Sequence, residues 1–269
     1  MHIIVTGANG FIGRRCIEKL LDHGHQVTAI LHPSDVPHPL LTECKIVKLD
    51  LFNLSLDEIE SVFSSADALL HLAWQAGFNH FDPCHIKNVL MHYDFIEKVV
   101  KSGVKKISVA GTMHEIGYHV GAVNALTPCN PLNPYGVAKN FLRQALFVLA
   151  KSENFDLQWL RFYYITGDDK FNNSIFAKIL QTDEKGEKTF PLNSGEMLYD
   201  FIDINELSEQ ISQRVISAES GIFNCSSGKP VSLRTKVEYF IQDNGLKIKP
   251  EYNVFPARPY DSMAIWGEQ

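Results

Sequence analysis

Short apolar runs alternate with amphipathic stretches of helical period over the first two-thirds of the chain. Runs with the length and composition of buried strands lie at 2–6, 26–31, 45–49, 67–73, 105–110 and 157–164. Helical patterns fill the intervals between them, over 11–22, 55–64, 84–102 and 135–152. Because this rhythm is typical of βαβ units, we predict an α/β fold with a doubly wound parallel sheet.

The strand–helix rhythm is lost after Gly167. Polar segments such as 183–188 interrupt the apolar stretches there, which predicts a smaller C-terminal substrate-binding lobe over 168–269 beside a main domain over 1–167. Apolar stretches at 200–203 and 221–224 are suited to return strands to the main sheet, so we expect 200–225 to rejoin the main domain. Open parallel sheets bind ligands beyond the carboxyl ends of their strands, and the site is expected there.

Composition narrows the class of ligand. The 269 residues include 45% hydrophobic residues, and the formal net charge is −6 without a long run of like charge. This balance argues against nucleic acid and membrane surfaces as partners. No leader pattern precedes the first strand, no apolar run reaches the roughly 18 residues of a membrane span, and the five cysteines lack CxxC spacing. We therefore expect a cytoplasmic protein with a small-molecule substrate and no metal site.

A glycine-rich turn follows the first predicted strand and opens the first predicted helix. Gly7 permits the tight turn, Gly10 lets a diphosphate approach the backbone, and Gly13 lets the helix pack on the strand. The N-terminus of the helix then faces the anion. This context predicts a dinucleotide site of the Rossmann type, in which the residues between the glycines also line the cofactor: Asn9, Phe11 and Ile12.

The end of the second predicted strand bears on the choice of cofactor. An acid there pairs with the ribose 2′-hydroxyl of NAD, and a basic residue with the 2′-phosphate of NADP. The segment 29–34 contains no acid, so we predict NADP, with NAD open, and propose His32 as the phosphate contact, aided by Arg14 and Arg15. Asp50, after the third strand, is a candidate for the adenine pocket or for a strand-end cap.

A phenol and an ammonium lie four residues apart in Tyr135 and Lys139, on one face of a helix predicted to begin after Asn133. The ammonium and a positive nicotinamide are expected to lower the Tyr135 pKa from its usual value of about 10. Tyr135 would then exchange the proton that accompanies hydride transfer at a carbinol carbon. Thr112, at the end of the fifth strand, is placed to hold a substrate carbonyl oxygen toward Tyr135.

In combination, these motifs resemble the extended short-chain dehydrogenase/reductase family, whose epimerases, dehydratases and reductases act on nucleotide sugars. The matching positions span nearly the whole chain: the turn from Thr6 to Gly13, Asp50-Leu51, His71-Leu72-Ala73, Asn88, Thr112, Gly117, Tyr135, Lys139, Arg161, Gly167 and 200–203. The resemblance implies a catalytic set of Asn88, Thr112, Tyr135 and Lys139.

The resemblance also implies contacts outside the catalytic set. At the cofactor it places Asp50, Leu51, Leu72, Ala73 and Tyr164, with the loop after Tyr164 covering the nicotinamide. Near the nucleotide diphosphate it places Asn172, Asn173, Ser174 and Arg258, with a solvent-facing position as the alternative for Arg258. His114 and Glu115 are candidates for sugar recognition, or else face solvent.

Three reactions compete within this group. Family dehydratases carry an acidic pair directly after the threonine, and Met113 and His114 stand there instead, which argues against dehydration. The short lobe and the missing strand-end acid favour reduction of a 4-keto-6-deoxy nucleotide sugar with NADPH. An epimerase that retains NAD and a non-catalytic NADP-sensing protein are the alternatives, although such sensors usually lack the active-site tyrosine. A homodimer through the outer faces of 84–102 and 135–152 is also expected.

Overall fold

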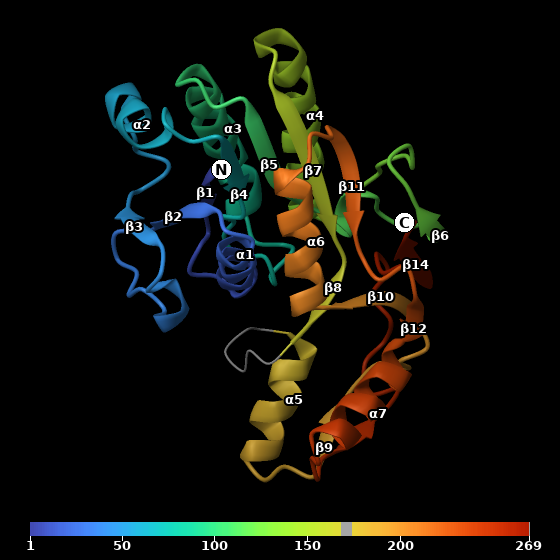
Figure 1. The fold of residues 1–269 in the computed structure, drawn as a ribbon. Coiled ribbons are helices and arrows are strands. Elements are labelled where there is room, and N and C mark those ends of the chain that lie inside the picture. The colour runs from blue at the N-terminus through green and yellow to red at the C-terminus, as the bar shows by residue number, and fades with distance from the viewer. Residues whose placement is uncertain (168–173, 269) are drawn as a thin grey trace.

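The computed structural model describes residues 1–167 and 174–268, and a seven-stranded parallel sheet forms its centre (Figure 1). The strand order is β11-β7-β5-β4-β1-β2-β3, and all six pairings are parallel. The strands are β1 (His2–Thr6), β2 (Gln26–Leu31), β3 (Lys45–Lys48), β4 (Ala68–His71), β5 (Lys106–Thr112), β7 (Asp156–Phe162) and β11 (Gly221–Cys225). The sheet confirms the predicted α/β, Rossmann-type fold.

Helices cover both faces of this sheet. On one face, α1 (Phe11–Asp22) packs against α6 (Ile204–Ile216). On the other lie α2 (Leu56–Phe63), α3 (Cys84–Lys101) and α4 (Pro134–Glu153), with α3 against α4. Successive residues of β1 serve opposite cores, Ile3 facing α1 and Ile4 facing α2–α4, which is the alternation expected of a strand buried on both sides.

Local signals explain where the helices begin and end. Asn133 caps α4 by accepting a hydrogen bond from the Gly136 amide at 2.8 Å, and Pro134 stands at the start of the first turn. Asn154, with a φ of 53°, ends the same helix in the left-handed conformation. The four helices predicted from the pattern of apolar residues all form, with bounds within two residues of the expectation.

A smaller lobe extends from the carboxyl ends of these strands. Its helices are α5 (Ile175–Glu184) and α7 (Leu233–Asp243), and its core contains Met197, Val237 and Ile265. One sheet has the order β12-β10-β14-β6 with β8 paired to β10, and a second joins β13 to β9. These strands are β6 (Val120–Val123), β8 (Tyr164–Thr166), β9 (Thr189–Pro191), β10 (Leu198–Asp203), β12 (Pro230–Ser232), β13 (Lys249–Glu251) and β14 (Ala264–Gly267).

Of the two segments expected to return strands to the main sheet, only one does so. β11 pairs with β7 at the edge of the main sheet, whereas β10 pairs with β8, β12 and β14 in the lobe. The buried carboxylate of Asp200 explains the difference, because it accepts amide hydrogen bonds from Ser227, Gly228 and Gly267, all in the lobe or beside it. The division into domains at 167/168 stays a prediction.

Two short 3₁₀ helices also occur, η1 (Pro39–Leu41) and η2 (Met113–Glu115). In the part of the chain that the structure describes, no helix combines the length and the apolar character needed to cross a bilayer. The expected location in the cell stays a prediction.

Candidate active site

The glycine turn after β1 is built for close contact between backbones. Gly7 has a φ of +67°, and a Cβ added there would lie 2.6 Å from the Ala73 amide nitrogen. A Cβ on Gly13 would lie 2.3 Å from the Gly7 carbonyl oxygen. Gly10 begins α1 without a side-chain cap, and the first turn carries no acid, so the amides of this helix end are suited to a diphosphate. The turn therefore fits the dinucleotide expected from the sequence.

The segment after β2 folds back toward this turn. The side-chain amide of Asn9 donates to the Val36 carbonyl oxygen at 3.0 Å. Its oxygen accepts from the His38 backbone amide at 2.9 Å. Asn9 therefore ties the two loops together.

An acid, Asp35, lies four residues after the end of β2. The chain turns at 32–35, where the Asp35 amide donates to the His32 carbonyl oxygen at 2.9 Å, and the Asp35 carboxylate accepts from the His32 amide at 3.1 Å. The His32 imidazole is exposed and contacts Ser34. The segment 29–34 therefore does not settle the choice of cofactor, because an acid follows it directly at Asp35 and folds back to the end of the strand.

The remaining residues expected at the cofactor differ in their surroundings. Asp50 accepts hydrogen bonds from the Phe52 amide and the Asn53 side chain, which is the strand-end cap that was the alternative. The Ala73 amide donates to the Thr6 hydroxyl at 3.4 Å, so it lies directly beside the turn. Half-buried apolar contacts with the two cores are made by Phe11, Ile12, Leu51 and Leu72.

Thr112, Tyr135 and Lys139 come together where β5 ends and α4 begins. The Thr112 and Tyr135 side chains share a hydrogen bond, and the Lys139 ammonium donates to the Ala110 carbonyl oxygen at 2.7 Å. The contact between η2 and α4 is very close, since a Cβ on Gly136 would lie 2.3 Å from the His114 carbonyl oxygen. Two hydroxyls and an ammonium thus share one corner, which is the arrangement the sequence predicted.

Burial dominates the titration of this corner. Burial raises the pKa of Tyr135 to about 12, against the hydrogen bond from Thr112, and the negative charge of Glu115 raises it further. Burial lowers the pKa of Lys139 to about 7, against the charge of Glu115. In the protein alone, burial thus outweighs the ammonium, which faces a carbonyl and an indole, and the lowering of the Tyr135 pKa expected beside a bound nicotinamide stays a prediction.

That indole belongs to Trp74, which follows β4 by three residues. The Lys139 ammonium lies 3.8 Å from the ring centroid of Trp74, and His92 stacks on the indole at 4.4 Å. His92 and His71 are joined by a hydrogen bond of 2.9 Å, and His71 contacts the Thr6 hydroxyl at 2.8 Å. Burial lowers the pKa of His71 to about 3 and that of His92 well below its usual value. A neutral polar chain thus links the glycine turn to the ammonium.

Imidazoles line another side of Tyr135. His80 stacks on the phenol at 5.3 Å, His114 lies 6.0 Å from it, and the two imidazoles are 4.1 Å apart. Burial, aided by the charge of Arg258, lowers the pKa of His80 to about 4 and that of His114 to about 3. Arg258 is exposed, yet its charge acts on this side of the corner.

Other predicted contacts lie apart from this corner or are already occupied. The Asn88 amide donates to the Gln75 side chain at 2.7 Å, Tyr164 stacks on Tyr199 in the lobe at 4.2 Å, and Ser174 caps α5. Their functional roles stay predictions. Asn172 and Asn173 lie outside the described residues. Glu115 is fully buried, so the proposal that it recognises the sugar is wrong.

Comparison with known proteins agrees with this geometry. The model of the NAD dependent epimerase/dehydratase family matches residues 3–225. The chain is 60% identical over 268 residues to a dTDP-6-deoxy-L-talose 4-dehydrogenase (NAD+) of Aggregatibacter actinomycetemcomitans, covering 99% of each chain. It is 26% identical to an uncharacterised UDP-glucose epimerase of Bacillus subtilis, over 79% of this chain and 72% of that protein.

Solved structures show the same fold. A UDP-glucose 4-epimerase of Thermus thermophilus in complex with NAD superposes with a TM-score of 0.85 at 22% identity, covering 100% of this chain and 90% of that one. At this identity the likeness concerns the fold, whereas the family match rests on the sequence. The chain therefore belongs to the NAD-dependent epimerase/dehydratase family and is an enzyme of the NAD(P)-dependent oxidoreductase class.

Proposed function

We propose that this enzyme interconverts the 4-keto and 4-hydroxyl forms of a dTDP-linked 6-deoxyhexose with NAD(H), and that reduction is its forward direction. The substrate class follows the relative named dTDP-6-deoxy-L-talose 4-dehydrogenase (NAD+), with which the chain shares 60% of its residues over 99% of its length. The observation that carries the chemistry is the hydrogen-bonded pair of Thr112 and Tyr135 beside the Lys139 ammonium.

Each residue of the corner has a distinct task in this reaction. Bound NADH supplies the hydride to the sugar carbon. Thr112 holds the carbonyl oxygen, and Tyr135 donates a proton to it as it becomes a hydroxyl. Burial raises the pKa of Tyr135 to about 12, which keeps the phenol protonated at neutral pH and suits a proton donor. The Lys139 ammonium stabilises the phenolate that forms.

Coenzyme binding and choice are assigned to the other side of the site. Gly7, Gly10 and the N-terminal amides of α1 would hold the diphosphate. Asp35 would accept hydrogen bonds from the ribose hydroxyls and repel a 2′-phosphate, which supports NAD over NADP. The NAD-dependent relative supports the same choice.

The test is an assay of the purified enzyme with dTDP-4-keto-6-deoxyhexoses, following NADH or NADPH consumption and identifying the sugar by NMR. We expect NADH to be consumed in proportion to the reduced sugar, with kcat/KM for NADPH at least about ten-fold lower because of the charge of Asp35. Matched UDP-linked and GDP-linked sugars serve as controls. Inversion at C4 without net NADH consumption, together with NAD released on denaturation, would identify an epimerase. Coenzyme binding without turnover of any sugar would identify a sensor.

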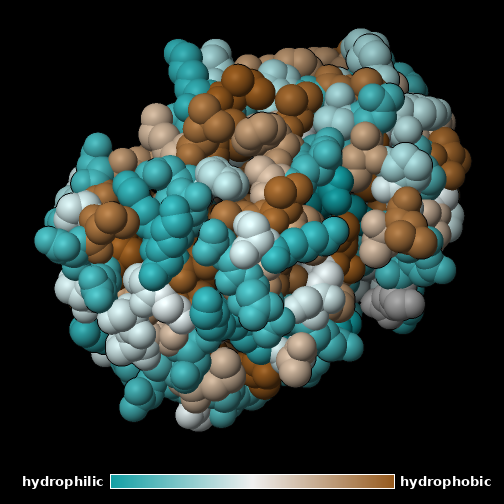
Figure 2. Space-filling view, turned by 90° about the horizontal axis from the view of Figure 1, so that it is seen from above, coloured by the Kyte–Doolittle hydropathy of each residue, from teal (hydrophilic) through white to brown (hydrophobic). Residues whose placement is uncertain are grey.

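We also infer a two-fold dimer through α3 and α4, which pack side by side. Val89 and Leu142 point into the core, whereas Leu90, Phe141 and neighbouring apolar side chains are exposed on the outer faces: Ile86, Met91, Val137 and Val148. Figure 2 shows hydrophobic residues gathered in patches among hydrophilic ones on the face seen from above. Light scattering should give a dimer mass, and Phe141→Asp should give a monomer, while Leu126→Asp, at an exposed position on neither helix, should not change the mass. A monomeric wild type would contradict the inference.

A further inference from the structure

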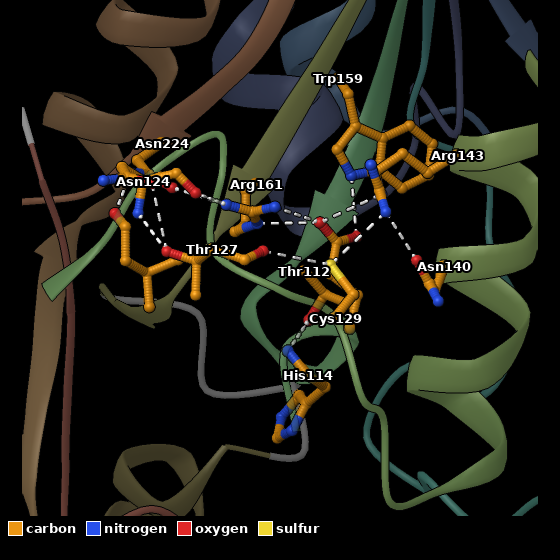
Figure 3. Close-up of polar contacts among 12 residues, drawn as sticks. Thr112, His114, Asn124, Thr127, Cys129, Asn140, Arg143, Trp159, Arg161 and Asn224 are labelled. Carbon is orange, nitrogen blue, oxygen red and sulfur yellow. Dashed lines mark hydrogen bonds and ion pairs between the residues drawn. The ribbon is translucent and has the colours of Figure 1, made fainter. Parts of the chain in front are cut away.

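A buried carboxylate stands directly behind the catalytic corner. Glu115, three residues after Thr112, has no exposed surface. Its carboxylate accepts hydrogen bonds of 2.8 Å from the Trp159 indole and from the Arg161 side chain, which also pairs with it through a second nitrogen at 2.8 Å. Arg143 approaches the same carboxylate at 3.8 Å. Figure 3 shows Trp159 and Arg161, both on β7, and Arg143 of α4 pointing toward one another.

Burying this ion pair contributes little net free energy to the stability of the fold. Removing a carboxylate and a guanidinium from water costs several kcal/mol per ion, and well-packed apolar residues of similar volume are often at least as stable. Both Glu115 and Arg161 are fully buried, so neither charge is relieved by solvent. A charge pair in this place therefore calls for a reason other than stability.

The carboxylate connects the two elements that carry the catalytic hydroxyls. On the side of β5, a Cβ on Gly111 would lie 2.2 Å from the Trp159 indole nitrogen, so the indole that donates to Glu115 also rests on the residue before Thr112. On the side of α4, Arg143 follows Lys139 by one turn and donates to Asn140 at 2.8 Å. Movement of Glu115 would therefore disturb both elements.

The Glu115 carboxylate also contributes negative charge to the surroundings of the catalytic corner. It faces Arg161 and Tyr163 from β7 and the segment after it, and Cys129 from the loop before α4. From α4 it faces Arg143, Lys139 and Tyr135. Its negative charge raises the pKa of Tyr135 and of Lys139 alike, favouring the protonated phenol and the ammonium.

We propose that Glu115 is a positioning residue for the reaction at Tyr135: its buried carboxylate fixes the end of β5 against α4 and provides a negative charge behind the catalytic side chains. The proposal rests on the proposed function, because it assigns the proton donor to Tyr135. Glu115 does not touch the substrate. Its influence passes through Trp159 and Arg161 on one side and Arg143 on the other.

The first test is Glu115→Gln, measured in the coenzyme-loaded enzyme. Misplacement of the hydroxyl pair should lower kcat by about 10- to 100-fold. KM for NADH should stay within about three-fold, because the glycine turn is untouched. NMR of tyrosine labelled at Cζ, assigned with Tyr135→Phe, should show Tyr135 titrating at lower pH than in the wild type. Asp200→Asn is the control for the titration: this equally buried carboxylate bonds to backbone amides of the lobe, and its loss should leave the Tyr135 titration unchanged.

The second test is the double variant Glu115→Gln with Arg161→Gln, which removes both charges and is expected to fold even where the single variant does not. We expect kcat to stay low and Tyr135 to titrate at lower pH than in the wild type. Recovery of wild-type kcat would show that Glu115 only balances Arg161, and an unshifted Tyr135 titration in either variant would also overturn the proposal. The titration needs no sugar, so it decides the matter even if the wild type turns over no dTDP-linked substrate, a result that would count against the proposed function alone.

Discussion

The two sides of the active site differ in whether the backbone or the side chains form them. The coenzyme turn after β1 is made of backbone, and its contacts are so close that Gly7 and Gly13 leave no room for a Cβ. The corner at the ends of β5 and α4 is made of side chains, in which Thr112, Tyr135 and Lys139 depend on buried polar partners. Coenzyme binding at the turn should therefore weaken when an atom is added. Catalysis at the corner should weaken when a functional group is removed.

Removal of the Tyr135 hydroxyl should have the largest effect. Tyr135→Phe deletes the proton donor, so kcat should fall by roughly 10²- to 10⁴-fold. Because no part of the turn changes, calorimetry should find the NADH Kd within about three-fold of the wild type. Turnover near that of the wild type would show that another group donates the proton.

Addition of one methyl group to the turn should weaken coenzyme binding rather than remove a catalytic group. Gly7→Ala places a Cβ 2.6 Å from the Ala73 amide nitrogen at a φ of +67°. Strain of about 1–3 kcal/mol should appear as a roughly 10- to 100-fold weaker NADH Kd. Gly24→Ala is the matched control, since Gly24 also has a positive φ but nothing within 4 Å of the added atom. It should cost about 1 kcal/mol in the free energy of unfolding and leave coenzyme affinity unchanged. Equal NADH Kd values for Gly7→Ala and Gly24→Ala would contradict the proposed role of close backbone contact in the turn.

The indole under the ammonium should matter less than the phenol. Trp74→Leu removes the ring face 3.8 Å from the Lys139 ammonium, and a desolvated contact of this kind is worth about 2 kcal/mol. We expect kcat to fall by roughly 10-fold in Trp74→Leu and by less in Trp74→Phe, which keeps an aromatic face. Identical rates for the two variants, measured in steady-state assays, would mean that the ring serves only to fill space.

The last effect should appear in the pH dependence of stability rather than in activity. Burial holds the pKa of His71 at about 3, so between the unfolded value of about 6.5 and this value only the unfolded chain takes up the proton. Stability should therefore decrease as pH falls through this window, by up to about 1.4 kcal/mol per pH unit for each such histidine. Denaturant unfolding at several pH values should show a flatter slope in His71→Gln with His92→Gln, but not in the exposed-site control His32→Gln. An unchanged slope in the double variant would contradict the buried pair.

The sequence predicted the turn better than the corner because the turn is local. The glycine spacing, the strand before it and the apolar stripe of α1 all lie within 2–22, and the bounds of α1 were predicted to the residue. The Tyr135/Lys139 spacing and the position of Thr112 at a strand end were likewise enough to predict that these three side chains lie together.

What the sequence could not show depends on pairings across long stretches of chain. Glu115 meets Arg161 only because β5 and β7 are neighbours, and β10 joins the lobe because Asp200 bonds to backbone amides up to 67 residues away. The acid at the end of β2 was missed for a simpler reason, since the turn at 32–35 brings Asp35 back to the strand. The first two errors concern contacts that no local pattern encodes, whereas the third concerns a local turn.

The three tryptophans fall in three separate parts of the enzyme. Trp74 lies under the ammonium, Trp159 is sealed in the core of the main sheet, and Trp266 lies on β14 of the lobe. Replacing any two with phenylalanine would leave a single tryptophan in the third place. Natural emission could then distinguish coenzyme entry, opening of the core and rearrangement of the lobe as separate optical signals, without any attached dye.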